Sequence, residues 1–155
     1  MKLRHIIEGK QVGIIYHLVS LKGMREIMKN DSLETLNFSN ISTTRDKSRT
    51  HYVGDRGNYF RLVLDGDKLS NKYKIEPYQY RSISGTVGDE METRIKTEKI
   101  SNVSKYIFRI EILQQQIEHL FTMRDEPEDE GFVNSVKELI KKVENWKVPV
   151  KFVEN

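Results

Sequence analysis

The sequence of 155 residues contains no cysteine, which excludes disulfide bonds and thiolate metal ligands. No apolar run approaches the roughly 20 residues that a membrane-spanning helix needs. Residues 1–5 lack the apolar segment of a signal peptide, and neither an internal repeat nor a low-complexity linker interrupts the chain. We therefore expect a cytoplasmic protein that forms a single domain over residues 1–155.

Neither sign of charge is in large excess. The chain has 26 Lys and Arg residues against 23 Asp and Glu residues, a formal net charge of +3. This balance predicts a mixed surface rather than one that binds nucleic acid throughout. Residues 45–58 are locally basic, and their many turn-forming residues predict a loop that fits nucleic acid or an acidic protein surface.

Several catalytic motifs are missing. The sequence contains no phosphate-binding Walker loop, no dinucleotide-binding Gly-x-Gly-x-x-Gly and no His-Glu-x-x-His zinc motif. None of its four histidines stands in a nucleophile-elbow context, so a serine-hydrolase triad is not supported.

The pattern of apolar residues predicts a mixture of strands and helices. Alternating, β-branched or aromatic residues predict strands over 11–19, 38–44, 59–65, 88–95, 106–112 and 148–152, the fifth of them central. Apolar residues at helical spacing predict helices over 21–28, 113–121 and 132–143, the first of them closing near residues 30–31. Residues 65–67 are predicted to form a turn, and 72–88 an irregular loop that covers a site. Strands interleaved irregularly with few helices indicate an α+β fold.

The segment Gly88-Asp89-Glu90-Met91-Glu92-Thr93-Arg94-Ile95 places two carboxylates two residues apart in a predicted strand. Because successive strand side chains point to opposite faces, Glu90, Glu92 and Arg94 share one face. Two carboxylates this close repel each other, so a cationic ligand, a developing positive charge, a metal or an arginine must compensate them. The pair therefore indicates a cleft, and the alternative is a solvated edge strand with a Glu/Arg face.

His17 lies between apolar residues in the first predicted strand. There a histidine is either a structural residue held by a hydrogen bond or, beside a ligand cleft, a hydrogen-bond donor to sugar hydroxyls. Two interpretations are likewise open for the hydroxyl residues at the end of the next strand, Ser42, Thr43 and Thr44. Their hydroxyls either cap the local backbone or orient a carboxylate and contact a ribose, with Arg45 as a candidate phosphate ligand.

The acidic residues are also compatible with binding of a metal ion. Asp65, Asp67, Glu90 and Glu92 are oxygen ligands for a hard cation if their strands are adjacent, as in a metal-dependent nuclease. No lysine follows the acidic pair at the spacing of the restriction-nuclease motif. Arg61 offers a simpler partner for the pair, through an ion pair with Glu90 or Glu92 across neighbouring strands.

The order of these features resembles that of the ADP-ribosyltransferase superfamily. The resemblance is carried by Tyr16-His17-Leu18, the helix over 21–28, Ile41-Ser42-Thr43-Thr44-Arg45 and Glu90-Met91-Glu92, within residues 12–112. Residues 14–28 look especially like the start of DNA-targeting ADP-ribosyltransferase toxins, and 61–70 resemble small bacteriophage proteins. The resemblance implies split antiparallel β-sheets with flanking helices.

The resemblance also implies roles for single residues. Glu92 would be the catalytic acid, Glu90 the helper that activates the acceptor group, and His17 the ligand of the nicotinamide-side ribose of NAD. Further NAD contacts are implied for Leu18, Ser42, Thr43, Thr44, Arg45, Tyr59 and Arg61. The aromatic that stacks on nicotinamide stays open among Tyr52, Tyr59, Tyr78 and Tyr80. We expect His17, Ser42 and Glu92 to line one hollow.

Three functions are compatible with these residues. The first is a phage-encoded, NAD-dependent ADP-ribosyltransferase that consumes NAD to modify a host protein or nucleic acid in the host cytoplasm. The second is a catalytically inactive domain of the same fold that binds a host protein or a nucleotide as an inhibitor. The third is a metal-dependent nuclease. The first two require neither a metal ion nor a membrane.

Overall fold

The computed structural model of the protein describes residues 12–35, 39–48, 57–77, 80–81, 87–88, 92–122 and 130–154. Its strands are β1 (Ile14–Val19), β2 (Ser32–Glu34), β3 (Ile41–Thr44), β4 (Phe60–Asp65), β5 (Ile75–Pro77), β6 (Tyr80–Arg81), β7 (Val87–Gly88), β8 (Glu92–Ile95), β9 (Lys99–Ser101), β10 (Ile107–Leu113) and β11 (Val150–Val153). Its helices are α2 (Leu21–Asn30), α3 (Gly66–Ser70), α4 (Gln114–Thr122) and α5 (Glu130–Glu144), with one 3-10 turn, η1 (Val103–Tyr106).

Seven of the strands form one sheet, in the order β11-β10-β4-β1-β3-β8-β5. Its neighbouring strands run antiparallel except β10 and β11, which are parallel. Two further pairs, β2 with β9 and β6 with β7, form small two-stranded sheets. The prediction of a mixed α+β protein is confirmed, and its sheet is mostly antiparallel.

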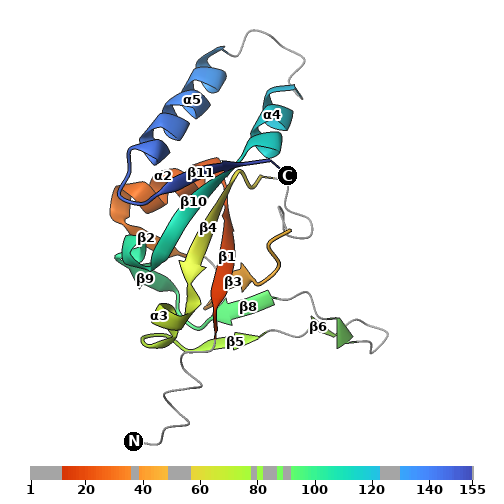
Figure 1. Ribbon diagram of the computed structural model, residues 1–155, viewed down its shortest axis with the longest axis vertical. Helices are drawn as coiled ribbons and strands as arrows, with labels where there is room; N and C mark the ends of the chain where they lie inside the picture. The colour runs from red at the N-terminus through yellow and green to blue at the C-terminus, as the bar shows by residue number, and fades with distance from the viewer. Residues whose placement is uncertain are drawn as a thin grey trace, which may run out of the picture.

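The large sheet consists of two well-paired halves that meet at a narrow junction. β1 pairs with β4 over its whole length, from Ile14 opposite Asp65 to Val19 opposite Phe60. Its register with β3 on the other side contains the single pair Tyr16 and Thr44. In Figure 1, β8 and β5 run across the direction of β1, β4 and β10. The backbone groups near this junction therefore depend partly on side chains for their hydrogen bonds.

One face of the sheet is apolar and packs against helices. The core on this face includes Ile15 and Val19 of β1, Met24 and Ile27 of α2, Leu62 and Leu64 of β4, Ile110 and Ile112 of β10, and Val136, Leu139 and Val143 of α5. The helices α2 and α5 thus bury their apolar stripes against the alternating apolar residues of the strands.

Local signals explain where α2 begins and ends. Ser20 is the N-cap, and its Oγ accepts a hydrogen bond from Gly23 N at 3.0 Å. The helix ends at Asn30 because Asp31 adopts the left-handed conformation, with φ of 47°. Ser104 N holds this turn by donating to Asp31 Oδ1 at 2.8 Å. The predicted helix, which begins at residue 21 and closes near 30–31, is confirmed.

The opposite side of the sheet carries many polar side chains, and we call it the polar face. Residues opposite each other in a ladder point to the same side of a sheet. The register therefore assigns to the polar face the side chains of Tyr16, Leu18, Ser42, Thr44, Arg61, Glu92, Arg94 and Glu111. His17, by the same alternation, belongs to the apolar side together with Ile15 and Val19.

Three local predictions are corrected. Residues 65–67 start a helix rather than forming a turn, because Asp65 caps α3 by accepting a hydrogen bond from Lys68 N at 3.0 Å. Residues 72–88 are not irregular throughout, since they contain β5, β6 and β7. Pro77 is tolerated there because β5 is an edge strand. The strand β10 is not central, since only β11 separates it from the edge.

An irregularity in β10 also changes the predicted alternation. The register with β4 shifts between Ile107 and Arg109, so Ile107 is buried and Phe108 is 48% exposed. In β8 the predicted alternation is confirmed for the described part, because Thr93 and Ile95 are buried while Glu92 and Arg94 are half-buried. The short elements β2, β9 and η1 are not predicted, because three or four residues are too few to show a period.

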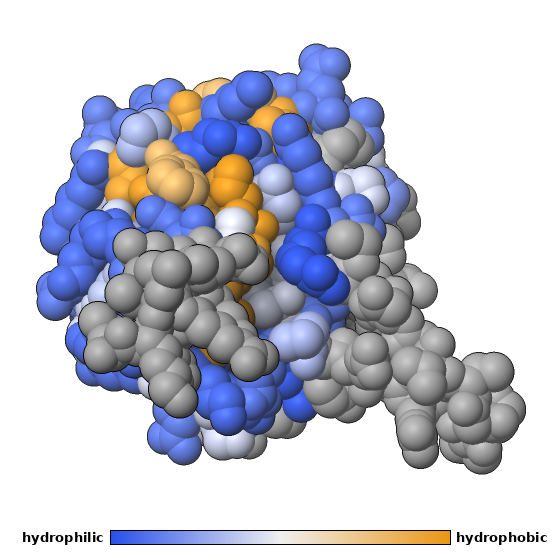
Figure 2. Space-filling view, turned by 60° about the horizontal axis from the view of Figure 1, so that its bottom comes forward, coloured by the Kyte–Doolittle hydropathy of each residue, from blue (hydrophilic) through white to orange (hydrophobic). Residues whose placement is uncertain are grey.

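On the face shown in Figure 2, the coloured residues are mostly hydrophilic, and the hydrophobic ones gather in one area. Within the described residues, the exposed large apolar side chains are Ile14, Phe108 and Phe152, each between 43% and 48% exposed. Such single exposed residues are usual on protein surfaces. No helix in the described ranges has both the length and the apolar composition needed to cross a bilayer.

Candidate functional site

His17 projects from β1 at the point where pairing with β3 ends. Its Nδ1 lies 2.7 Å from the backbone oxygen of Ser42. Because a carbonyl oxygen only accepts, Nδ1 carries the proton and donates. The imidazole therefore supplies a donor that the strand backbone would provide in a regular ladder. Nε2 is then the unprotonated nitrogen of the neutral ring.

The surroundings of His17 keep the ring neutral. Burial lowers the pKa of His17 below its ordinary value of 6.5, and the contact with the Ser42 carbonyl only partly opposes that shift. A neutral ring with Nδ1 protonated offers Nε2 as a hydrogen-bond acceptor near pH 7. The prediction that His17 donates to sugar hydroxyls is therefore corrected, because Nδ1 is used on the Ser42 carbonyl and Nε2 can only accept from a hydroxyl.

Ser42 and Glu92 are joined on the other side of the junction. Ser42 Oγ donates to Glu92 Oε1 at 2.6 Å, and Arg94 Nε lies 3.3 Å from the same oxygen. Both contacts that the described residues make with this carboxylate use Oε1. Oε2 is consequently the oxygen that remains for another donor, while Arg94 compensates the negative charge.

His17, Ser42 and Glu92 form one hydrogen-bonded series, but they do not share one side of the sheet. The imidazole reaches the backbone of Ser42 from the apolar side, whereas the Ser42 hydroxyl and the Glu92 carboxylate belong to the polar face. The prediction that the three residues line one hollow is therefore wrong, although hydrogen bonds link them at the junction. Of the three, only His17 lines the pocket described next.

A pocket of about 540 Å³ lies between α2, the end of β1 and β2. Its size is within the range of small-molecule sites. Its lining residues are His17, Leu18, Val19, Ser20, Lys22, Gly23, Glu26, Ile27, Asn30, Ser32, Leu33, Glu34 and Asn58. We call it the α2 pocket.

Asn58 is a lining residue of the pocket that sequence patterns did not single out. Asn58 belongs to the predicted loop 45–58, and it is only 4% exposed. Its Nδ2 has no hydrogen-bond partner. Nothing in the local sequence marks this asparagine, because its neighbours resemble those of any polar loop residue.

The hydroxyl run after Ser42 serves the fold itself. Thr43 is buried, and its Oγ1 donates to the backbone oxygen of Thr93 at 2.7 Å. Thr44 is also buried, and its Oγ1 accepts from Asp46 N at 3.0 Å. This second contact caps the turn that follows β3, as one of the two interpretations of the run predicts. Arg45 beside them is exposed.

The remaining predicted NAD contacts lie in different surroundings. Leu18 is 3% exposed and lines the α2 pocket. Tyr59 is half-buried against the core, and its backbone N donates to Val19 O at 3.0 Å. Glu90, Tyr52 and Tyr78 lie outside the described residues, as does the side chain of Tyr80.

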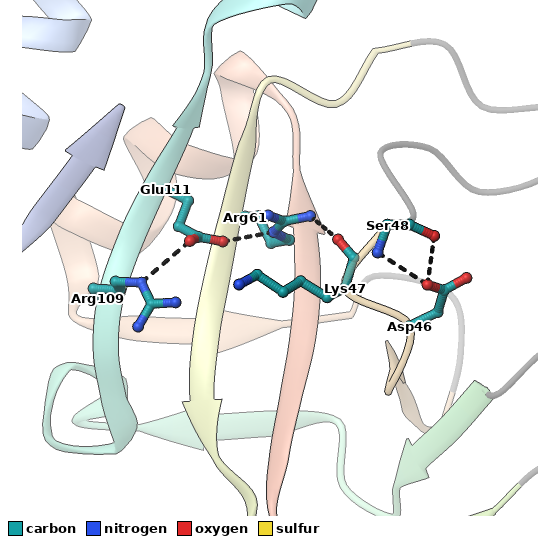
Figure 3. Close-up of polar contacts among 6 residues, drawn as sticks. All are labelled: Asp46, Lys47, Ser48, Arg61, Arg109 and Glu111. Carbon is teal, nitrogen blue, oxygen red and sulfur yellow. Dashed lines mark hydrogen bonds and ion pairs between the residues drawn. The ribbon is translucent and has the colours of Figure 1, made fainter. Parts of the chain in front are cut away.

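Arg61 forms a different ion pair from the predicted one. Its strand β4 neighbours β1 and β10, so two strands separate it from β8 and Glu92. Arg61 Nε instead donates to Glu111 Oε1 at 2.7 Å, and Arg109 Nε donates to Oε2 at 3.1 Å. Figure 3 shows the Glu111 carboxylate between the two guanidinium groups. The guanidinium of Arg61 also donates through Nη1 to the backbone oxygen of Lys47.

The Arg61 network is buried and charged. Arg61 is 3% exposed and Glu111 is 1% exposed, and the Arg61 guanidinium lies 5.4 Å from the ring centre of Tyr16. Burial works to raise the pKa of Glu111, yet the ion pairs with Arg61 and Arg109 lower it overall. Glu111 therefore remains ionised and holds both arginines on the polar face.

The acidic residues considered for a metal are not adjacent. Asp65 caps α3, and Asp67 Oδ1 accepts from the backbone N of Val12 and of Gly13, each at 2.9 Å. Three strand spacings separate β4 from β8, which amounts to about 14 Å. Within the described part of the chain, no group of three or more His, Asp or Glu side chains is placed to hold a metal ion.

No protein-family model matches the sequence, and a comparison with curated proteins finds no match. The function is therefore argued from the residues at the junction of β1, β3 and β8 and from the pocket beside it.

Proposed function

We propose that the chain is an NAD-dependent ADP-ribosyltransferase of the superfamily that its motifs resemble. The observation that carries the proposal is the orientation of Glu92, whose Oε1 accepts from Ser42 Oγ at 2.6 Å. Ser42 and Glu92 are the hydroxyl and the acid that the resemblance pairs. The narrow junction between β1 and β3 supports the split-sheet fold that belongs to the same proposal.

The proposed chemistry needs a carboxylate at this place. Breaking the bond between nicotinamide and ribose develops positive charge on the sugar. A carboxylate that accepts a hydrogen bond from the ribose 2′-hydroxyl stabilises that charge as it forms, so it binds the transition state more tightly than the substrate. Glu92 supplies this group through Oε2, because Ser42 and Arg94 contact Oε1.

His17 and the α2 pocket contribute binding. The neutral imidazole presents Nε2 as an acceptor for a ribose hydroxyl. The pocket of about 540 Å³ beside it has the size and mixed lining of a small-ligand site. The acceptor of the ADP-ribosyl group is a protein or nucleic acid of the host cytoplasm in this proposal, with Glu90 as the helper that activates it.

Release of nicotinamide tests the proposal directly. The protein is incubated with a bacterial lysate and NAD in two parallel assays. NAD labelled in the nicotinamide ring reports the release of free nicotinamide. NAD labelled in the adenylate reports the transfer of label to macromolecules. Wild type should release nicotinamide and transfer label, and Glu92→Gln should do neither. Glu98→Gln is the matched control, because Glu98 is exposed. Equal activity of wild type and Glu92→Gln would contradict the proposal.

A second candidate is a domain of the same fold that binds a nucleotide without turnover. The observation that favours it is the separation of His17 and Glu92 on opposite sides of the sheet. A single ribose that contacts His17 would then not also reach the Glu92 carboxylate, and a domain that only binds a nucleotide does not need it to. NAD binding measured by calorimetry, without release of nicotinamide at any lysate concentration, would identify this function.

A further inference from the structure

The α2 pocket contains a hydrogen-bond donor that the fold does not use. Asn58 is 4% exposed, lines the pocket, and its Nδ2 has no hydrogen-bond partner. Buried polar groups in native proteins are nearly always paired, because an unpaired donor loses its hydration without compensation. A buried amide of this kind at a pocket wall indicates that a bound molecule supplies the acceptor.

The pocket offers an acceptor as well. His17 lines the same pocket, and its Nδ1 is occupied by the Ser42 carbonyl. Nε2 of the ring is therefore available to accept a proton from a ligand hydroxyl or amine. Ile27 and Leu33 add apolar lining to the same pocket. One donor, one acceptor and an apolar surface match a flat heterocycle joined to a hydroxylated sugar.

The charges of the wall do not favour a phosphate. Its charged lining residues are Lys22, Glu26 and Glu34, and Glu34 Oε1 already pairs with Lys99 Nζ at 3.2 Å. Lys22 and Glu26 carry opposite charges, so the lining residues provide no excess of positive charge. The first turn of α2 also lines the pocket, but its Gly23 N donates to Ser20 Oγ. This balance favours an uncharged group in the pocket.

We infer that Asn58 is a specificity-determining residue that donates a hydrogen bond to a nucleoside held in the α2 pocket, with the phosphates of the ligand outside it. The nucleoside is the adenosine part of NAD, and this choice rests on the proposed function. Ring nitrogens of a purine are acceptors for the Asn58 amide, and ribose hydroxyls are donors for His17.

Binding of adenosine to the complete chain tests the inference. Calorimetry measures the affinity of wild type and of Asn58→Leu for adenosine, and side-chain amide NMR signals report whether Asn58 meets the ligand. Asn58→Leu should weaken adenosine binding by about tenfold, the usual effect of one lost hydrogen bond to a ligand. The unfolding midpoint should stay unchanged or rise, because the substitution removes an unpaired polar group.

Asn30→Leu is the matched control. Asn30 lines the same pocket at the end of α2 but is exposed, so adenosine affinity should stay within about twofold. Inorganic pyrophosphate should not displace adenosine from wild type. The inference is overturned if wild type does not bind adenosine, if Asn58→Leu binds it as well as wild type, or if pyrophosphate competes.

The inference and the proposed function can fail separately. If adenosine binding depends on Asn58 while Glu92→Gln releases nicotinamide and transfers label as wild type does, the proposed function fails and this inference stands. If label transfer depends on Glu92 and the KM for NAD is unaffected by Asn58→Leu, the inference fails and the proposed function stands.

Discussion

Ser42 and Glu92 are joined across β3 and β8 by a hydrogen bond of 2.6 Å between Oγ and Oε1. The two residues are diagonal neighbours, because Ser42 stands opposite Arg94 and Glu92 stands opposite Thr44. A diagonal contact is within reach of a long side chain such as glutamate. It directs the carboxylate along its strand, and this orientation is the basis of the proposed role of Glu92.

Removing the Ser42 hydroxyl should therefore affect both folding and chemistry. We expect Ser42→Ala to lower the free energy of unfolding by about 1 kcal/mol, since one half-buried hydrogen bond is lost. Nicotinamide release should fall by about tenfold or more, because Glu92 loses the donor that fixes it. Urea unfolding and a turnover assay measure the two effects.

The exposed Ser101 of β9 provides the control for that substitution. Ser101→Ala should leave both the unfolding free energy and nicotinamide release unchanged, since surface changes of this kind are usually within about 0.5 kcal/mol. A Ser42→Ala variant that loses stability but keeps full turnover would show that Ser42 is structural only.

Glu111 should be far more important for stability. Glu111→Leu leaves the buried Arg61 without its carboxylate, and an uncompensated buried charge costs about 3–5 kcal/mol. The double variant Arg61→Met with Glu111→Leu should recover much of this loss, because neither charge is then buried alone. Urea unfolding of wild type, Arg61→Met, Glu111→Leu and the double variant measures the coupling between the two positions.

An exposed ion pair should contribute much less to stability than the buried pair of Arg61 and Glu111. Glu76 on the edge strand β5 lies 2.9 Å from Lys74 Nζ, and both side chains are exposed. Glu76→Gln should leave the urea midpoint unchanged, because exposed ion pairs are weak. Equal effects of Glu76→Gln and Glu111→Leu would mean that the Arg61 network is solvated.

Short-range signals in the sequence predicted those parts of the fold that depend on neighbouring residues. The helix after Ser20 is predictable because an N-cap and apolar residues at helical spacing stand together. The strand β4 is predictable because Phe60, Leu62 and Leu64 alternate with other residues. In the candidate site, the same alternation placed Glu92 and Arg94 on one face, and the structure has them in contact.

Features that depend on strand order are not predictable from local patterns. Arg61 pairs with Glu111 because β10 lies beside β4, and no period in either strand contains that information. The opposite orientations of His17 and Ser42 follow from the register of β1 with β3. Asn58 acquires its significance only from burial next to a pocket.

His17 should make folding stability depend on pH near neutrality. Burial lowers its pKa below 6.5, its ordinary value, and the Ser42 carbonyl opposes the shift only in part. Between the lowered pKa and 6.5 the folded protein binds fewer protons than the unfolded chain. The stabilising contribution is therefore complete above pH 6.5 and is lost as the pH falls through that window. His17→Gln should show no decline of the urea midpoint in this window.

Protonation of Glu111 should cause a separate loss of folding stability at lower pH. Burial acts to raise the pKa of Glu111, but its arginine partners lower it below 4.5. Its contribution is present above pH 4.5 and is lost as the pH falls toward the lowered pKa. Glu111→Gln, measured at a series of pH values, should flatten only this lower part of the profile. A single transition that both variants affect equally would contradict the assignment.

Among the glycines whose surroundings the structure describes, Gly66 should have the least space for a side chain. A Cβ at Gly66 would lie 2.3 Å from the backbone oxygen of Gly13 and 2.6 Å from Val12 Cγ1. The same place is held together by the hydrogen bond from Gly66 N to Gly13 O at 2.9 Å. Gly66→Ala should therefore lower the unfolding free energy by about 1–3 kcal/mol.

Gly131 in α5 provides the control. A Cβ at this position meets no atom within 4 Å, so Gly131→Ala should raise the unfolding free energy by up to about 1 kcal/mol through helix propensity. Thermal unfolding of both variants should consequently shift in opposite directions, and equal shifts would mean that residues 12–13 do not pack on α3.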